Sequence, residues 1–217
     1  ASKPITNSIA ARYLGRRSII DLSGIDQLRF HPRCYYRPAE DDVPGVREAW
    51  PAMIAAVTDN EGTITGVHRT WLDPQSHDKA AVAYPRRAMG RLLGSGVRFG
   101  KAGGVMVAGE GLETLLSLRQ VMPSMAMIAG LSAAHLAAIQ FPAKLRCLYV
   151  ARDDDPAGAT ALSTLTERCD PVGIAVIPLE PRLDDFNSDL TAYDHERLAA
   201  AIRVQLSAAD AVRFLKR

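Results

Sequence analysis

The sequence predicts an α/β protein whose second half forms a parallel sheet covered by helices on both faces. From Gly104 onward, short apolar runs alternate four times with segments of helical periodicity, and this alternation is typical of parallel sheets with crossover helices. The first hundred residues are less regular and indicate a smaller α+β subdomain, while the end of the chain indicates further helices. We therefore expect an N-terminal subdomain over 1–102, a second domain over 103–190 and a C-terminal helical segment over 191–217.

Composition and charge narrow the class of protein. The chain has 217 residues, of which 47% are hydrophobic and 23% charged, and its formal net charge is +2. Any nucleic-acid surface must therefore be local. The cysteines (Cys34, Cys147 and Cys169) have no CxxC spacing, which argues against a zinc ribbon or a disulfide framework. No apolar stretch approaches the roughly 18 residues of a membrane helix, and the N-terminus lacks a signal-peptide pattern, so a reducing, cytoplasmic setting is expected.

The N-terminal subdomain contains one helical segment and one hairpin pattern. Residues 8–17, SIAARYLGRR, have helical periodicity. The β-rich segments 51–59 and 63–73 flank Asn-Glu-Gly at 60–62, which predicts a hairpin with a tight turn. Residues 74–104 are rich in Gly, Pro and Arg, so we expect a loop with short elements there.

The second half supplies the strands and helices of the expected parallel sheet. The segment 145–151, LRCLYVA, is the clearest strand because it is apolar and rich in β-forming residues. Ser132 is a candidate helix cap and Pro156 suits a first helical turn. The expected strands are 105–110, 125–130, 145–151 and 173–179, the expected helices are 113–122, 132–141 and 156–169, and residues 195–217 should form one or two more helices.

Acidic residues follow three of these strands. Glu110 ends the first strand, Asp153 and Asp155 follow the third, and a cluster follows the fourth, comprising Asp184, Asp185, Asn187 and Asp189. Functional groups of such sheets gather beyond the carboxyl ends of the strands. Residues two apart in an extended segment point to the same side, so Asp153 and Asp155 can face one point. Oxygen ligands of this kind favour Mg²⁺ or Mn²⁺.

A structural interpretation of the same residues stays open. In DDDPAG, Asp155 can be the N-cap of a helix with Pro156 at its first position, and the helix dipole favours acids there. Glu110 alone fits a solvated strand end. Acids at the ends of consecutive strands are harder to explain in this way, which favours the metal site.

These residues resemble the pattern of a Toprim domain, the catalytic module shared by bacterial-type primases, topoisomerases and some nucleases. That pattern is a strand ending in Glu-Gly, then a strand ending in Asp-x-Asp followed by Ala-Gly, then a further acidic cluster. Here the corresponding segments are VAGEG with Glu110, ARDDDPAG with Asp153 and Asp155, and DDFNSD. The similarity covers about residues 103–190 and implies a Toprim-type parallel sheet.

The first half is similar to the subdomain that precedes Toprim in bacterial-type primases. The matching segments are ARYLGRRSI at 11–19, the hairpin AAVTDNEGTITGVHRTWLD at 55–73, and Lys79 followed by YPRRAMG. The chain thus resembles the RNA-polymerase core of primases from mobile elements and phages. It departs from the pattern at Thr114, where such primases often have a second acid; Glu113 stands one position earlier, and we assign it no role from the sequence.

The resemblance implies a Mg²⁺-dependent nucleotidyltransferase that synthesises short RNA primers on single-stranded DNA from nucleoside triphosphates. It implies that Asp153 and Asp155 hold Mg²⁺ (or Mn²⁺), that Asp185 or Asp189 contributes to a second ion, and that Glu110 is a metal ligand or the general base for the attacking 3′-hydroxyl. A zinc-ribbon module and a GxxxxGK[ST] helicase loop do not occur in this sequence, so such partners are expected on another part or chain.

Other functions stay open at this point. A Toprim nuclease would cut DNA with the same metal site, and a degenerate domain would bind nucleic acid or a replication partner without catalysis. Topoisomerase chemistry is disfavoured because it needs a nucleophilic tyrosine on an additional large domain, and none of the six tyrosines has an evident claim to that role.

A locally basic stretch is the candidate contact for phosphates. Residues 86–101 contain five basic residues and no acid, and Lys79 precedes them. We expect these side chains to bind nucleic acid or nucleotide, although a solvated loop is the alternative: Lys79, Arg86, Arg87, Arg91, Arg98 and Lys101.

A few further residues have weaker claims. His68 and Arg69 are candidates to join these basic residues in a nucleic-acid-binding groove. For Trp71 and Tyr84, packing is favoured over base stacking. His135 is expected on a helix surface, and Arg152 is expected to pair with Asp154.

Overall fold

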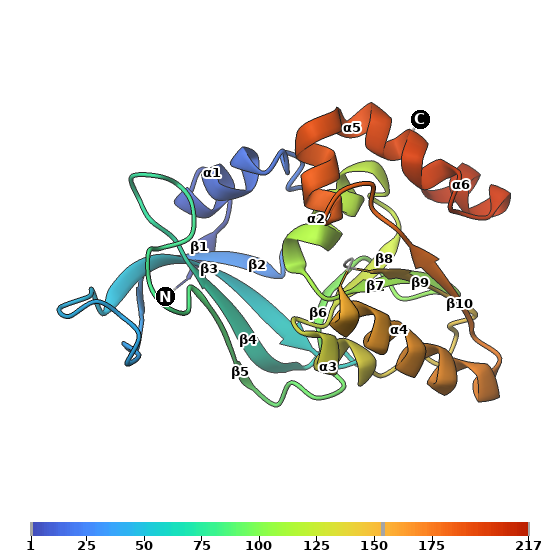
Figure 1. The fold of residues 1–217 in the computed structure, drawn as a ribbon, viewed down its shortest axis with the longest axis horizontal. Helices are drawn as coiled ribbons and strands as arrows, with labels where there is room; N and C mark the ends of the chain where they lie inside the picture. Colours follow the sequence, from blue (N-terminus) through green and yellow to red (C-terminus); the bar gives the residue numbers. More distant parts are fainter. Residues whose placement is uncertain (1, 153–154, 217) are drawn as a thin grey trace.

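The computed structural model describes residues 2–152 and 155–216. Within these ranges the strands form two five-stranded sheets, one from each half of the chain (Figure 1). The mixed α/β architecture expected from the sequence is confirmed. No helix in the described ranges combines the length and the apolar character needed to cross a membrane.

The first sheet is antiparallel, with its strands in sequence order: β1 (Lys3–Pro4), β2 (Leu28–Tyr35), β3 (Ala49–Thr58), β4 (Ile64–Trp71) and β5 (Arg86–Gly90). The expected hairpin is confirmed as β3 and β4. Its turn is held by Asp59, whose Oδ1 accepts from the N–H groups of Glu61 (3.1 Å) and Thr63 (2.8 Å). Gly62 supplies the left-handed conformation that this turn needs, with φ of 83°.

Strand β2 was not among the expected elements. It contains Pro32, and proline lacks the N–H that a central strand donates. The register between β2 and β3 shifts between His31 and Cys34, so the proline is accommodated at an irregularity. Helix α1 (Ile9–Arg16) agrees with the expectation for 8–17, and the Ser8 hydroxyl caps it by accepting from the N–H of Ala11 at 3.2 Å.

The second sheet has the strand order β10-β9-β7-β8-β6. Strands β7 (Val105–Gly109), β8 (Ala126–Ala129), β9 (Cys147–Ala151) and β10 (Ala175–Leu179) are parallel. The short strand β6 (Val97–Phe99) adds an antiparallel edge against β8. It comes from the segment where only short elements were expected, and it belongs to the second sheet although it precedes residue 103.

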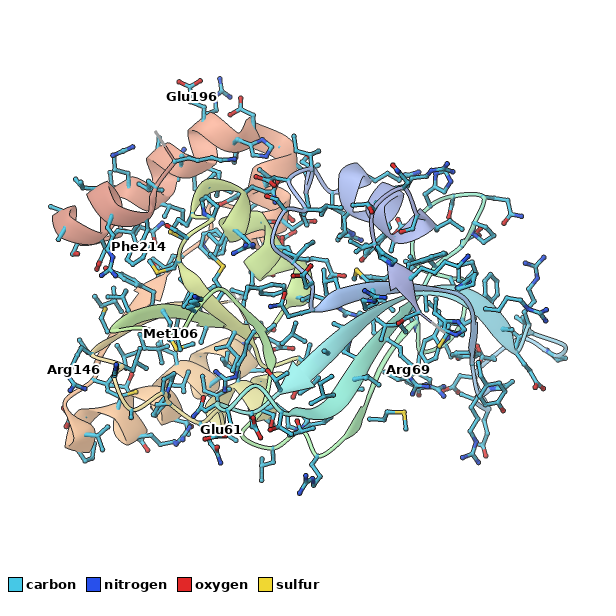
Figure 2. The ribbon with its side chains drawn as sticks, turned by 180° about the vertical axis from the view of Figure 1, so that it is seen from behind. Glu61, Arg69, Met106, Arg146, Glu196 and Phe214 are labelled. Carbon is cyan, nitrogen blue, oxygen red and sulfur yellow. The ribbon has the colours of Figure 1, made fainter. Side chains whose placement is uncertain are left out.

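Helices cover both faces of this sheet (Figure 1): α2 (Leu112–Val121) and α5 (Phe186–Arg203) lie on one face, and α3 (Ala133–Ala137) and α4 (Pro156–Cys169) on the other. The side chains of β7 alternate accordingly. Val107 packs in the core that includes α2 and α5, whereas Met106 and Ala108 pack in the core that includes α3 and α4. Figure 2 shows Met106 within the sheet and Glu196 on the outer side of α5.

Helix α3 is shorter than the expected 132–141. Ser132 caps it as expected, but the N–H of Ala138 already bonds to the carbonyl of His135, and the N–H of Gln140 bonds to Gly94 in another loop. Helix α5 begins inside the acidic cluster and kinks at Asp194, where φ is 78°. The 3₁₀ turn η1 (Asp170–Val172) follows α4, and α6 (Ala208–Phe214) confirms a second C-terminal helix.

The two halves share one hydrophobic core. That core joins Tyr13 and Leu14 of α1 and Met53 of β3 to Leu115 of α2 and Val107 of β7. A β-bridge between Thr58 and Gly96 also links the first sheet to the segment that enters the second. The relative position of the two sheets is therefore set by packing, which fixes the space between them.

Candidate active site between the two sheets

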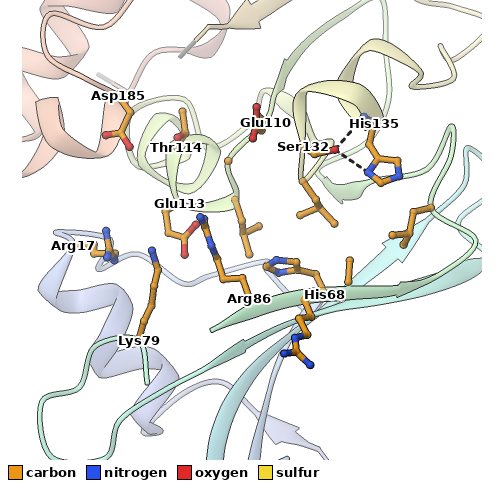
Figure 3. A pocket seen from close by; sticks show the side chains of 16 residues that line it. Arg17, His68, Lys79, Arg86, Glu110, Glu113, Thr114, Ser132, His135 and Asp185 are labelled. Atoms are coloured by element: carbon orange, nitrogen blue, oxygen red, sulfur yellow. Dashed lines mark hydrogen bonds between the residues drawn. The ribbon is translucent and has the colours of Figure 1, made fainter. Parts of the chain in front are cut away.

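A cavity of about 610 Å³ lies between strands β4 and β5 of the first sheet and the carboxyl end of β7 in the second. Figure 3 shows Glu110 and Asp185 on one side of this cavity, with Lys79, Arg86 and His68 across from them. One wall is therefore acidic and the opposite wall is cationic. Segments that are far apart in the sequence supply these walls.

Glu110 follows β7 directly, which places its carboxyl group at the end of a central strand. Burial, and next the negative charge of Asp155, raise the pKa of Glu110, while the charge of Arg86 opposes that shift. The two carboxylates therefore lie within electrostatic reach of each other. This agrees with the expected convergence of acids at one sheet edge.

Asp155 is the N-cap of α4, and its Oδ1 accepts from the N–H of Gly158 at 2.7 Å with Pro156 in the first turn. The capping interpretation of DDDPAG is thus confirmed for Asp155, and the same side chain also acts on Glu110. The two interpretations are compatible. Asp153 and Asp154 lie outside the described residues, and so does the expected pairing of Arg152 with Asp154.

The two acids expected to serve a second ion have different surroundings. Asp185 caps α5, with its Oδ1 accepting from the N–H of Ser188 at 2.6 Å, and it lines the cavity. Asp189 is 2% exposed, and its carboxylate oxygens accept from the N–H groups of Arg182 (2.8 Å) and Leu183 (2.9 Å). Asp189 therefore braces the loop before α5.

The donor chemistry of this edge fits a hard divalent cation. Glu110 and Asp155 offer carboxylate oxygens, and the repulsion between them is what a cation would relieve. Within residues 2–152 and 155–216, no three His, Cys, Asp or Glu side chains are grouped closely enough to hold a metal ion. The assignment of Asp153 as a ligand stays a prediction, because this residue lies outside the described ranges.

The basic residues expected to contact phosphate divide into two groups. Lys79, Arg86 and Arg87 line the cavity. In the described ranges, the cavity lining does not include Arg91, Arg98 or Lys101. Arg98 is partly buried on β6, where its Nε donates to the carbonyl of Thr58 at 3.4 Å, whereas Arg91 and Lys101 are exposed.

Glu113 is a buried member of the site to which the sequence assigned no role. It stands in the first turn of α2, and the Tyr13 hydroxyl donates to its Oε1 at 2.6 Å. Although burial acts to raise the pKa of Glu113, the Tyr13 hydrogen bond and the charges of Lys79 and Arg86 outweigh it and lower that pKa. Glu113 is therefore an anion surrounded by the cationic wall.

Arg17 is a second residue that sequence reasoning missed. Its guanidinium lies 4.9 Å from the centre of the Tyr13 ring, its Nη1 donates to Asn187 Oδ1 at 3.1 Å, and its Nη2 lies 3.5 Å from Asp78 Oδ1. These contacts join α1, α5 and the loop before Lys79. The only signal in the sequence was the helical motif ARYLGRRSI, which contains both Tyr13 and Arg17.

Two histidines also line the cavity. His135, which was expected on a helix surface, faces Ser132, whose Oγ lies 2.9 Å from its Nδ1. His68 is buried in the cavity wall. Trp71, by contrast, packs edge-on against Tyr36 with ring centres 5.1 Å apart, as the packing interpretation expects.

Comparison with known proteins identifies the second half of the chain. Residues 105–194 match the family model of the Toprim domain. The chain carries a Toprim domain. Residues 1–99 match the model of a domain of unknown function (DUF7146), so the cavity lies between the Toprim domain and this second family domain. A search of curated protein sequences found no match.

Solved structures share the arrangement of the whole chain. A DNA primase domain from Pseudomonas aeruginosa aligns with a TM-score of 0.57 at 17% identity, covering 92% of this chain and 72% of that one. The zinc-binding and RNA polymerase domains of the Aquifex aeolicus primase align with a TM-score of 0.56 at 17% identity, covering 94% of this chain and 57% of that one.

A third structure is the RNA polymerase domain of the Mycobacterium tuberculosis primase DnaG, in complex with a double-stranded DNA oligomer that has a 6-nucleotide overhang. It has a TM-score of 0.54 at 14% identity and covers 96% of this chain and 78% of that one. At these identities the likeness establishes a shared fold. The Toprim domain and its N-terminal neighbour are thus arranged as in bacterial primase cores.

Proposed function

We propose that this protein is a primase-type, metal-dependent nucleotidyltransferase that synthesises short RNA primers on single-stranded DNA. One observation carries the proposal: Glu110 of the Toprim domain and Arg86 of β5 line the same cavity, and each lies within electrostatic reach of the other. Phosphoryl transfer needs such a pairing, because metal-binding acids and phosphate-binding cations must hold the same triphosphate. The primase-like fold supports the same reaction class.

Acidic residues of the Toprim domain would hold the metal. We assign Glu110, Asp153 and Asp155 to Mg²⁺ (or Mn²⁺), and we assign Asp185 to a second ion. Asp189 is a weaker candidate than Asp185, because both of its oxygens already accept backbone N–H groups. When bound at these residues, such ions would neutralise the charge that develops on the transferred phosphoryl group.

The remaining roles belong to the chain itself. Lys79 and Arg86 would bind the phosphates of the nucleoside triphosphate from the cationic wall. Arg87 is a weaker candidate, because its Nη1 donates to the carbonyl of Arg37 at 2.7 Å and its guanidinium lies 4.8 Å from the centre of the Tyr36 ring. If Glu110 is not a metal ligand, it would act as the general base toward the 3′-hydroxyl of the growing primer. Arg91 and Lys101 are exposed outside the cavity, where they would contact the template strand.

Template recognition involves further partners in this proposal. Single-stranded DNA and nucleoside triphosphates are the substrates, and a zinc-ribbon or helicase module would come from another part or chain. The Aquifex aeolicus structure combines zinc-binding and RNA polymerase domains in one protein, which supports the zinc-ribbon part of this expectation.

A single assay tests the proposal. The protein is incubated with single-stranded DNA template, Mg²⁺ and labelled nucleoside triphosphates, and the products are separated by size. We expect short labelled oligomers that depend on Mg²⁺. Scission of the template in place of synthesis would instead identify a Toprim nuclease.

The variant Glu110→Gln links the assay to the site. Removing this charge should reduce primer synthesis at least a hundredfold, because the metal loses a ligand or the reaction loses its base. Glu196→Gln is the matched control, since Glu196 lies on the outer side of α5 (Figure 2) and should leave synthesis unchanged. Full synthesis by Glu110→Gln would refute the assignment.

A further inference from the structure

His68 is an unpaired polar side chain in the wall of the cavity. It lies on β4 opposite Ala88 of β5, it is 7% exposed, and it lines the cavity. Figure 3 shows its ring beside Arg86, across the cavity from Glu110. Its Nδ1 is buried and has no hydrogen-bond partner among residues 2–152 and 155–216. A buried polar atom without a partner costs about 1–3 kcal/mol, so a rearrangement of the ring on ligand binding that gave Nδ1 a partner would recover that cost.

His68 differs from its neighbours in charge. Burial lowers the pKa of His68 to about 4, and the charges of Arg86 and Arg69 add to this shift while Glu113 opposes it. The imidazole is therefore neutral at physiological pH, beside the cations Lys79 and Arg86. A neutral ring that can donate or accept suits an uncharged hydroxyl, whereas the cations suit phosphate.

The proposed function limits which part of a nucleotide His68 can meet, and this inference rests on that function. The phosphates belong to the cationic wall and the metal. The edge of the base must stay free to pair with the template, and the 3′-hydroxyl must be available for the next addition. Of the two ribose hydroxyls, the 2′-hydroxyl is the one that remains.

We propose that His68 hydrogen-bonds the 2′-hydroxyl of the nucleoside triphosphate in the cavity and makes this site select ribonucleotides over deoxyribonucleotides. A site with a buried group that pairs with a substrate hydroxyl rejects the analogue lacking it, because that group is left unpaired. His68 is thus a specificity-determining residue, and the Toprim acids need not sense the sugar.

A double-mutant cycle between protein and ligand tests this inference. The dissociation constants of ATP and 2′-deoxy-ATP are measured by titration calorimetry with Mg²⁺, for the full 217-residue chain and its variants. We expect the wild-type protein to bind ATP about tenfold more tightly, the value of one net hydrogen bond. In His68→Phe this ratio should fall to near one, through weaker binding of ATP.

The variant His68→Gln keeps a hydrogen-bonding group in a side chain of similar reach, so it should retain part of the preference for ATP. His195→Phe is the control, because His195 lines a separate groove beside α5, and its ratio should equal that of the wild type. Thermal unfolding of each variant identifies any that fails to fold, and His68→Gln then carries the test alone.

Two results would overturn the inference while sparing the proposed function. One is equal weakening of both nucleotides in His68→Phe, and the other is an unchanged ratio, each in a protein that still makes primers. If the wild type binds neither nucleotide and makes no primer, the proposed function fails, and this inference fails with it.

Discussion

At the scale of single residues, two acids of this site have a structural role that is shown and a chemical role that we propose. Asp155 and Asp185 each cap a helix through Oδ1, and each lies close to the acidic wall of the cavity. A cap holds its carboxylate in one orientation at the positive end of the helix dipole. Capping is therefore compatible with the metal-binding role that we propose for these side chains.

The substitution Asp155→Asn separates the two duties. Asparagine caps helices as well as aspartate does, so the melting temperature should stay within about 2 °C of the wild type. Metal-dependent synthesis should fall at least a hundredfold, because the charge is lost. Asp155→Ala should lose the same activity and also about 1 kcal/mol of folding stability, since the cap is removed. Retained activity in Asp155→Asn would show that its charge is not needed.

His68 should make stability depend on pH. Its pKa is about 4 in the folded protein, against about 6.5 in the unfolded chain, so the unfolded state binds more protons between these values. The contribution of His68 to the free energy of unfolding is therefore fully present above pH 6.5. It is lost as the pH falls toward 4, by roughly 3 kcal/mol at most.

Urea unfolding across this pH range checks the prediction. The free energy of unfolding of the wild type, minus that of His68→Gln, should decrease as the pH falls from 6.5 to 4. The reason is that histidine titrates in this range and glutamine does not. Glu113, Arg86 and Arg69 act on His68 and are present in both proteins. A difference that stays constant with pH would show that the imidazole is not held neutral.

At the scale of elements, the cationic wall depends on how β5 is placed against β4. Gly90 ends β5 with φ of 116°, and a Cβ atom there would lie 2.4 Å from the carbonyl oxygen of Thr65. Only glycine allows this close pairing. The pairing sets Arg86 opposite Thr70 and Arg87 opposite Arg69, so it also sets which guanidinium groups reach the cavity.

The substitution Gly90→Ala should disturb this strand pair. We expect a loss of about 2 kcal/mol or more in unfolding free energy, because strain and the contact with Thr65 add together. Nucleotide affinity should fall as well. Gly15→Ala in α1 is the matched control, since nothing lies within 4 Å of a Cβ atom there, and it should stabilise the protein by about 0.5–1 kcal/mol. Urea unfolding gives the free energy of unfolding of both variants. If Gly90→Ala and Gly15→Ala change it equally, a Cβ atom at position 90 causes no strain.

At the scale of the whole molecule, neither half makes the site alone. Arg86 comes from β5 and Lys79 from the loop between β4 and β5, while Glu110 and Asp185 come from the Toprim domain. Buried Glu113 joins the two halves, since its partner Tyr13 lies on α1. The shared core around these residues keeps the walls at a fixed separation.

The locally basic stretch should make the affinity for single-stranded DNA depend on salt concentration. The net charge is only +2, so a strong salt dependence requires a concentrated basic surface. Replacing Arg91 and Lys101 by Gln should reduce the slope of log K against log salt by up to about 1.4, which is 0.7 for each lost phosphate contact. Fluorescence anisotropy at several salt concentrations gives this slope. The exposed pair Arg203 and Arg213, on α5 and α6, is the control, and a wild-type slope near zero would exclude an electrostatic groove.

The sequence alone determined the parallel sheet and its acidic edge. Alternation of apolar residues and helix-capping patterns are local signals, and β7, β9 and their helices follow them closely. The same signals placed Glu110 and Asp155 at strand ends. Strand β2 was not predicted. Pro32 within it is a local signal against a strand, and pairing with β1 and β3 overrides that signal.

Tertiary structure alone decided which polar residues face one another. Arg86 and Arg98 belong to one basic stretch, yet Arg86 lines the cavity and Arg98 bonds to Thr58, because their strands join different sheets. Glu113 gained its place through Tyr13, a residue 100 positions away. Local patterns set the elements because they act over a few residues, whereas the burial and charge of a side chain depend on whatever the fold packs against it.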